Sequence, residues 1–146
     1  MNTHNSSLIS LLEPVPVPVI TTPPQPVQPP VGQNDNSKRA EEAKTLGNQA
    51  FSTSSFISEV YPPASTKKKN KLHMEGKRKF KEAAQHYTQA IDLDGQNHIY
   101  WSNRSMAYLR LGENQKALED ADRVISINAV WPKGYFRRGS ALFGMS

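Results

Sequence analysis

Two pairs of polar side chains have the spacing of neighbours on one face of a helix, and each pair contains a cation. Lys44 and Asn48 are four residues apart, and so are Lys133 and Arg137. The second pair is unfavourable by itself, because like charges at this spacing repel by roughly a few tenths of a kcal/mol. A lysine in the first turn of a helix also opposes the positive end of the helix dipole. Such costs indicate that these cations serve a negatively charged ligand.

Asn103 lies in the middle of a helical pattern, YWSNRSMAYLRLG, where asparagine is a poor helix former. Its side chain competes with the backbone for hydrogen bonds, which mildly destabilises a helix. The amides of Asn103 and Asn48 can instead donate to a ligand. Hydrogen bonds to charged groups contribute about 1.5–3 kcal/mol each. Cations and amide donors that converge would therefore bind a carboxylate, which presents two acceptor oxygens.

The elements that must position these residues are helices. SKRAEEAKTLGNQAF begins with a capping serine and continues with helix formers, which predicts a helix over about 38–51. The stretch 52–75 has no sustained period and contains a Pro-Pro break, so we expect a loop whose last residues join the next helix. KFKEAAQHYTQAIDL has apolar residues at helical spacing and is followed by Gly95, which we expect to cap it.

Three further segments read as helices: NHIYWSNRSMAYLRLG, NQKALEDADRVISI and VWPKGYFRRGSALFGM. A turn around Gly112 separates the first two. Pro132 lies in the first turn of the third, where a helix tolerates proline best. Short helices joined by brief turns predict an all-α fold of antiparallel helix pairs.

Residues 1–37 differ from the rest of the chain. Within them, EPVPVPVITTPPQPVQPP alternates proline with small or β-branched residues, which forbids a helix and favours extended polyproline II. We expect a disordered Pro-rich tail over 1–37 that acts as a linker. A PxxP spacing from Pro23 to Pro26 leaves open a ligand for an SH3-like groove, although no basic residue lies within this segment.

The formal net charge of +5 is concentrated in one segment. Residues 67–81 carry eight Lys or Arg and one acid, a net +7, which leaves ten basic and twelve acidic residues, or −2, elsewhere. The high overall pI is therefore a weak argument for nucleic-acid binding. For the basic segment itself, nuclear import and contact with nucleic acid are the alternatives to a solvated loop and helix start.

The sequence does not indicate an enzyme. It has no cysteine, and EGKRKF lacks the second glycine and the Ser or Thr of a phosphate loop. The histidines at 4, 73, 86 and 98 lack the spacing of a metal site or catalytic triad, so we expect no metal and no cofactor. The apolar run LISLL is too short for a signal peptide or a membrane span. We expect a cytoplasmic protein, with the nucleus as an alternative, and no membrane partner.

An internal period of 34 residues is the strongest signal in the chain. Trp101 and Ser105 are followed 34 residues later by Tyr135 and Gly139. A pattern of small, large and small residues fits the second helix of the preceding pair, at Ala83, Tyr87 and Ala90. Small residues allow close helix crossing, and the aromatic residues fill the space between pairs.

These residues resemble the tetratricopeptide repeat from about residue 38 to residue 145. The resemblance implies an antiparallel helix-pair solenoid of about two and a half repeats over 38–146. Repeat 1 would be split by an insert at about 52–75, and repeat 3 would be truncated. The chain departs from the family pattern at Ala43 and Ala50, where large residues are usual, and at Gly95 and Ala129, where proline is usual.

In such arrays the first helices of successive pairs line a concave groove. The resemblance implies that five residues face it: Lys44, Asn48, Asn103, Lys133 and Arg137. Their arrangement is similar to the two-carboxylate clamp of co-chaperone repeat domains of the Hsp70-Hsp90 organizing type. By that resemblance, Lys44, Asn48 and Asn103 hold the main-chain carboxylate of the ligand's last residue. Lys133 and Arg137 hold its side-chain carboxylate and the preceding backbone.

The partner that the resemblance implies is the acidic C-terminal tail, ending Glu-Glu-Val-Asp, of cytosolic heat-shock chaperones of the 70 and 90 kDa classes. The expected function is thus that of an adaptor that binds proteins. A repeat scaffold that binds its partner by shape alone, without the clamp, is an alternative.

Overall fold

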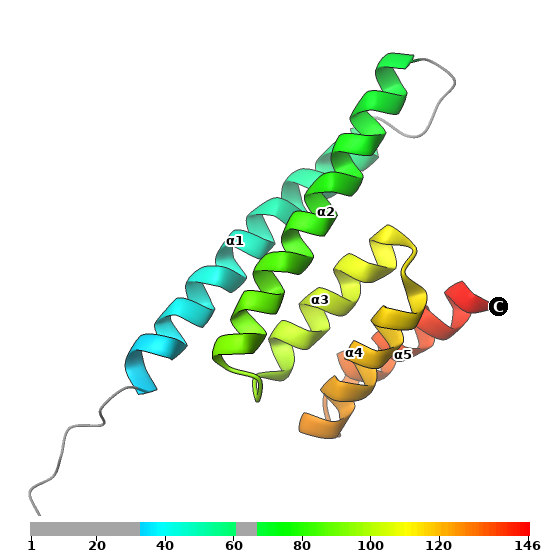
Figure 1. Ribbon diagram of the computed structural model, residues 1–146. Coiled ribbons are helices and arrows are strands. Elements are labelled where there is room, and N and C mark those ends of the chain that lie inside the picture. Colours follow the sequence, from blue (N-terminus) through cyan, green and yellow to red (C-terminus); the bar gives the residue numbers. More distant parts are fainter. Residues whose placement is uncertain (1–32, 61–66) are drawn as a thin grey trace, which may run out of the picture.

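The computed structural model describes residues 33–60 and 67–146, which form five α-helices. They are α1 (Gln33–Val60), α2 (Lys67–Leu93), α3 (His98–Leu111), α4 (Asn114–Ile127) and α5 (Pro132–Met145). Each helix packs against the next, and α3 also contacts α5. Figure 1 shows α1 and α2 as a long antiparallel pair beside the shorter α3, α4 and α5. The predicted all-α array of helix pairs is confirmed.

The first helix pair is longer than the sequence pattern predicted. The helix expected over 38–51 begins at Gln33 and continues to Val60, and the next helix begins at Lys67. The predicted loop is therefore wrong over 52–60, which belong to α1. Residues 67–75 belong to α2, which extends the expectation that the last residues of this stretch join the next helix, and 61–66 lie outside the described residues. The tail boundary at residue 37 is also wrong, since α1 begins at Gln33 and Ser37 lies inside it rather than at the predicted N-cap. Residues 1–32 of the predicted tail lie outside the described residues.

Contacts between α1 and α2 explain why a serine-rich stretch is helical. The rings of Phe51 and Phe80 meet edge to face with their centroids 5.1 Å apart. Beyond them, the buried hydroxyl of Ser54 donates a hydrogen bond to the backbone carbonyl of Gly76. Most of the stability of a protein helix comes from such tertiary packing rather than from intrinsic propensity. A local sequence pattern cannot reveal it.

The turns around α3 follow the expected chemistry in part. Gly112 adopts the left-handed conformation, with φ of 77°, and ends α3, as the turn at this position requires. Pro132 lies in the first turn of α5, as predicted. Gly95 was expected to cap α2. It does not adopt the positive φ of a glycine cap, because among the described residues Gly112 is the glycine with positive φ. The backbone carbonyl of Gly95 instead accepts a hydrogen bond of 3.0 Å from Nε1 of Trp101.

The core lies where α1, α2 and α3 meet, and it is built largely from alanine and tyrosine. Ala83, Ala90 and Ala107 are fully buried, and Tyr87 is 2% exposed. α1 and α2 approach so closely that a Cβ added to Gly47 would lie 2.6 Å from the ring of Tyr87. The small residues of the repeat pattern therefore allow the helices to approach closely, and the large ones fill the space between them, as that pattern predicts.

A buried ion pair fixes α3 against its neighbours. The guanidinium of Arg104 donates two hydrogen bonds, of 2.8 and 2.9 Å, to the carboxylate of Asp120 on α4. It donates a third, of 3.0 Å, to the hydroxyl of Thr88 on α2. The Asp120 side chain is only 5% exposed, so this bidentate pair is largely shielded from water. Asn103, the adjacent residue on α3, is thereby held on a rigid element.

Candidate functional site

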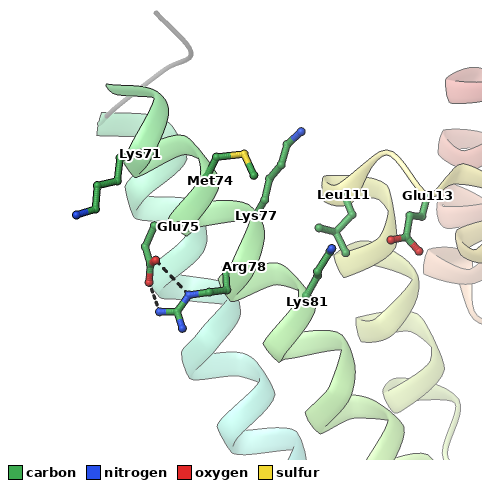
Figure 2. Close-up of a pocket in the computed structure, with 8 residues that line it drawn as sticks. All are labelled: Lys71, Met74, Glu75, Lys77, Arg78, Lys81, Leu111 and Glu113. Atoms are coloured by element: carbon green, nitrogen blue, oxygen red, sulfur yellow. Dashed lines mark hydrogen bonds and ion pairs between the residues drawn. The ribbon is translucent and has the colours of Figure 1, made fainter. Parts of the chain in front are cut away.

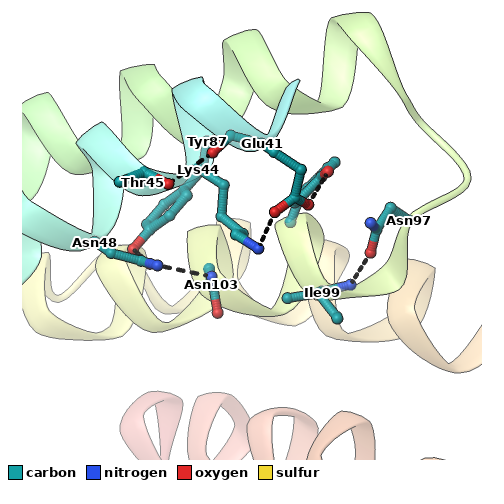
Figure 3. A network of polar contacts seen from close by, with 9 residues as sticks. Glu41, Lys44, Thr45, Asn48, Tyr87, Asn97, Ile99 and Asn103 are labelled. Carbon is teal, nitrogen blue, oxygen red and sulfur yellow. Dashed lines mark hydrogen bonds and ion pairs between the residues drawn. The ribbon is translucent and has the colours of Figure 1, made fainter. Parts of the chain in front are cut away.

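On α1, Lys44 lies in a small polar network that joins this helix to α3 (Figure 3). Its ammonium group binds the carboxylate of Glu41, and the hydroxyl of Tyr100 donates a hydrogen bond of 2.6 Å to the same carboxylate. The hydrogen bond from Lys44, and then that from Tyr100, lowers the pKa of Glu41 below its usual value. Glu41 is therefore ionised at neutral pH, and any ligand carboxylate that reaches Lys44 must compete with it.

The side-chain amides of Asn48 and Asn103 meet between α1 and α3. Nδ2 of Asn103 donates to Oδ1 of Asn48 at 3.4 Å, and the hydroxyl of Tyr87 donates to the same oxygen at 2.8 Å. Burial raises the pKa of Tyr87 to about 12, so this hydroxyl keeps its proton at neutral pH. With its oxygen engaged, Asn48 has its amide nitrogen left to donate to a ligand.

Lys133 and Arg137 lie one turn apart on α5. Lys133 is exposed, and its ammonium nitrogen is 5.8 Å from the ring centroid of Trp131. Arg137 is half-buried, and its Nε is buried with no hydrogen-bond partner among the described residues. Burial, and then the charge of Arg110, lowers the pKa of Arg137. A half-buried guanidinium that lacks an acceptor is costly, and an anionic ligand would relieve that cost.

The structure thus brings some of the five predicted residues into contact and not others. Asn48 and Asn103 touch, although 55 positions separate them in the chain, and Figure 3 shows Lys44 beside them. Within 33–60 and 67–146, no hydrogen bond or ion pair links this group to Lys133 or Arg137. Those two residues lie on α5, which packs against α3 and α4. All five residues therefore lie on the first helices of successive pairs.

Three residues that bear on this site were not identified from the sequence. Tyr87 was assigned to packing alone, although its hydroxyl orients Asn48. Glu41 is three residues before Lys44, a spacing that could have predicted their ion pair. Arg110 is two helical turns after Asn103, so it lies on the same face of α3.

Other kinds of site receive no support from the described part of the chain. No group of three or more His, Asp or Glu side chains there could hold a metal ion. None of the helices described above is both long enough and apolar enough to cross a membrane.

No family model matches the chain. Relatives with curated names include Hsp70-Hsp90 organising proteins. The protein STIP1 homolog of Dictyostelium discoideum is 34% identical over 110 residues, which are 75% of this chain and 15% of that protein. An Hsp70-Hsp90 organising protein of Plasmodium falciparum is 43% identical over 76 residues, 52% of this chain and 29% of that protein. The E3 ubiquitin-protein ligase TTC3 of Mus musculus is 41% identical over 66 residues, 45% of this chain and 3% of that protein. The chain thus spans less than a third of each of these relatives.

Two solved structures have a similar fold. The Arabidopsis OM64 TPR domain matches with a TM-score of 0.57 and 27% identity, over 75% of this chain and 71% of that chain. The first TPR of Spaghetti (RPAP3) bound to the HSP90 peptide SRMEEVD matches with a TM-score of 0.56 and 28% identity, over 75% of this chain and 69% of that chain. Together with the 34-residue period and the array of helix pairs, these similarities show that the chain belongs to the tetratricopeptide-repeat family.

Proposed function

We propose that this protein is an adaptor that binds the acidic C-terminal peptides of heat-shock chaperones through α1, α3 and α5. It acts by binding rather than by catalysis. The observation that carries the proposal is the meeting of Asn48 and Asn103 beside Lys44, because two amide donors and a cation form a binding site for a carboxylate. Support comes from relatives named Hsp70-Hsp90 organising proteins and from the similar domain that holds the HSP90 peptide SRMEEVD.

The two ends of the site take different parts of the ligand. Lys44, Asn48 and Asn103 bind the main-chain carboxylate of the last residue. The free amide end of Asn48 donates one hydrogen bond, and the ammonium of Lys44 turns from Glu41 to the ligand. That exchange costs little, because an exposed ion pair within one helix contributes only about 0.3–0.5 kcal/mol.

Lys133 and Arg137 bind the side-chain carboxylate of the ligand's last residue and the backbone before it. Arg137 gains most from this contact, since its buried Nε has no acceptor among the described residues. A charge-assisted hydrogen bond there contributes about 1.5–3 kcal/mol. Burial, and then the charge of Arg110, lowers the pKa of Arg137. The ligand's carboxylate also offsets the repulsion between these two cations.

The partners that fit are cytosolic chaperones of the 70 and 90 kDa classes, whose tails end Glu-Glu-Val-Asp. Because these partners are cytosolic, the cytoplasm is the compartment that the proposal assigns to the protein. Both classes present the same two terminal carboxylates, so the five residues serve either one.

Isothermal titration with a peptide ending Glu-Glu-Val-Asp tests the assignment of residues. The intact chain should bind with micromolar-order affinity, about 8 kcal/mol. Asn48→Ala and Arg137→Ala should each weaken binding by about tenfold or more, because each removes a hydrogen bond to a charged group. Lys38→Ala, which changes an exposed residue of α1, is the matched control and should bind like the parent protein. Unchanged affinity in both site variants would favour the alternative, a scaffold that recognises its partner by shape.

A further inference from the structure

A cleft separate from the five-residue site opens beside the first half of α2 (Figure 2). Its volume is about 630 Å³, and it lies between α2 and the turn that joins α3 to α4. One wall is a stripe of α2 residues at helical spacing, and the other is formed by the turn. The residues used below are Lys71, Met74, Lys77, Lys81, Leu111 and Glu113.

The α2 wall of this cleft carries cations without internal partners. Among the ion pairs of the described residues, Arg78 pairs with Glu75 and Lys79 with Glu82. Lys71, Lys77 and Lys81 form none. The three lysines therefore leave a local positive field that an anionic group from outside can neutralise.

The opposite wall does not supply the missing negative charge. The carboxylate of Glu113 on the α3–α4 turn is bound by the ammonium of Lys116 at 2.6 Å. Figure 2 shows Glu113 across the cleft from α2, on the far side of Leu111. The cleft as a whole is therefore electropositive.

The cleft also offers apolar surface. Met74 is 62% exposed, and Leu111 is half-buried at the edge of the turn. A second hollow of about 310 Å³ continues along α2, shares Lys81, Leu111 and Glu113 with the first, and adds Ala84 and Tyr108. The two hollows form an elongated groove, which we call the α2 groove, with an apolar floor and a basic rim. Methionine adapts its shape to different apolar partners.

We propose that the α2 groove binds an acidic amphipathic helix of another protein. Apolar side chains of that helix pack on Met74 and Leu111, and its carboxylates face Lys71, Lys77 and Lys81. Grooves between helices commonly bind a helix in this way, with apolar anchors at helical spacing. Because none of the five residues of the proposed carboxylate site lines the groove, the two ligands can bind together.

The groove is poorly suited to single-stranded nucleic acid, the other polyanion that lysines could bind. Bases bind non-specifically by stacking on exposed aromatic rings. Tyr108 is the aromatic residue of the groove, and the cations of Arg104 and Lys116 already lie 5.7 and 5.5 Å from its ring centroid. It is thus not an open platform for stacking.

Fluorescence anisotropy with the intact chain tests the proposal. The probe is a fluorescein-labelled amphipathic peptide of about 18 residues, built from Glu, Asp and Leu. Its C-terminus is amidated, so it presents no terminal carboxylate. Lys77→Glu/Lys81→Glu should weaken binding by about tenfold or more, since like charges across an interface are strongly unfavourable. Lys38→Glu/Arg39→Glu makes the same change of charge at exposed positions of α1 and should have less than about a twofold effect.

Met74→Ser tests the apolar part of the groove and should weaken the same peptide about threefold or more. Circular dichroism checks that each variant is folded. The free-acid peptide ending Glu-Glu-Val-Asp should bind every groove variant normally, so failure of this proposal is distinct from failure of the proposed function. Absence of binding by the acidic peptide, or equal losses in the groove and control variants, would overturn the proposal. A single-stranded DNA probe that binds where the peptide does not would overturn it in favour of nucleic acid.

Discussion

The hydroxyl of Tyr87 on α2 donates a hydrogen bond of 2.8 Å to Oδ1 of Asn48 on α1. The ring of Tyr87 is part of the repeat core, packed against Gly47, while its hydroxyl reaches the polar face. One side chain therefore joins the packing of the first helix pair to the orientation of a proposed ligand-binding amide. The geometry of the site depends in this way on the core beneath it.

Replacing Tyr87 with Phe should weaken the binding of a peptide ending Glu-Glu-Val-Asp. The ring and its packing remain, but Asn48 loses the hydrogen bond that orients it, which contributes about 0.5–1.5 kcal/mol, or roughly two- to tenfold in affinity. Tyr108→Phe is the matched control, because the Tyr108 hydroxyl bonds to no described residue. If calorimetry finds the two variants equal in affinity, Tyr87 does not orient the site.

Replacing Gly47 with Ala should lower the melting temperature. The added Cβ would lie 2.6 Å from one ring carbon of Tyr87, so α1 and α2 must move apart. Overpacking of this kind costs about 1–3 kcal/mol. Gly139→Ala is the control, since a Cβ there meets no atom within 4 Å. In a helix interior alanine is favoured over glycine by about 1 kcal/mol, so this variant should melt higher. A stable Gly47→Ala variant would contradict the close approach.

Replacing Glu41 with Gln should tighten peptide binding about twofold, because it removes the carboxylate that competes for Lys44. The same substitution should cost a little folding stability at neutral pH. The folded protein lowers the pKa of Glu41, so the carboxylate stabilises the fold above its ordinary pKa, and this contribution is lost as the pH falls through the lowered value. Unfolding curves of the two proteins should therefore converge in acid. A stability difference that persists there would have another cause.

Backbone amides of α5 should exchange with solvent faster than those of α3. Tyr135, Phe136 and Phe143 are 51%, 64% and 83% exposed, so α5 buries little of its apolar surface. Helices of this length are marginal without packing. Adding the Glu-Glu-Val-Asp peptide should slow the exchange of α5, because Lys133 and Arg137 then hold a ligand. Equal protection of α3 and α5 in the free protein would show that one packed face stabilises α5 fully.

The repeat pattern predicted the shorter helices well and the first pair poorly. α3, α4 and α5 follow from local periods and from Gly112 and Pro132, which act over a few residues. The extension of α1 depends on contacts such as that of Ser54 with Gly76, on a different helix, which no local pattern contains.

In the candidate site, too, the sequence pattern predicted some features and missed those that depend on contacts between helices. The repeat positions predicted that Asn48 and Asn103 lie on neighbouring first helices, and the two amides meet. The hydrogen bond from Tyr87 depends on the depth to which its ring enters the core, which spacing does not encode. The role in ligand binding of all five residues, Lys44, Asn48, Asn103, Lys133 and Arg137, stays a prediction.

The most direct test of the carboxylate site compares two peptides that both end Glu-Glu-Val-Asp, one as the free acid and one as the C-terminal amide. Amidation removes the charge and one acceptor oxygen from the group that Lys44, Asn48 and Asn103 are proposed to bind. Isothermal titration of the intact chain should find the amide weaker by about tenfold or more, as expected for the loss of one or more charge-assisted hydrogen bonds. Equal affinity for the two peptides would contradict the proposed carboxylate site.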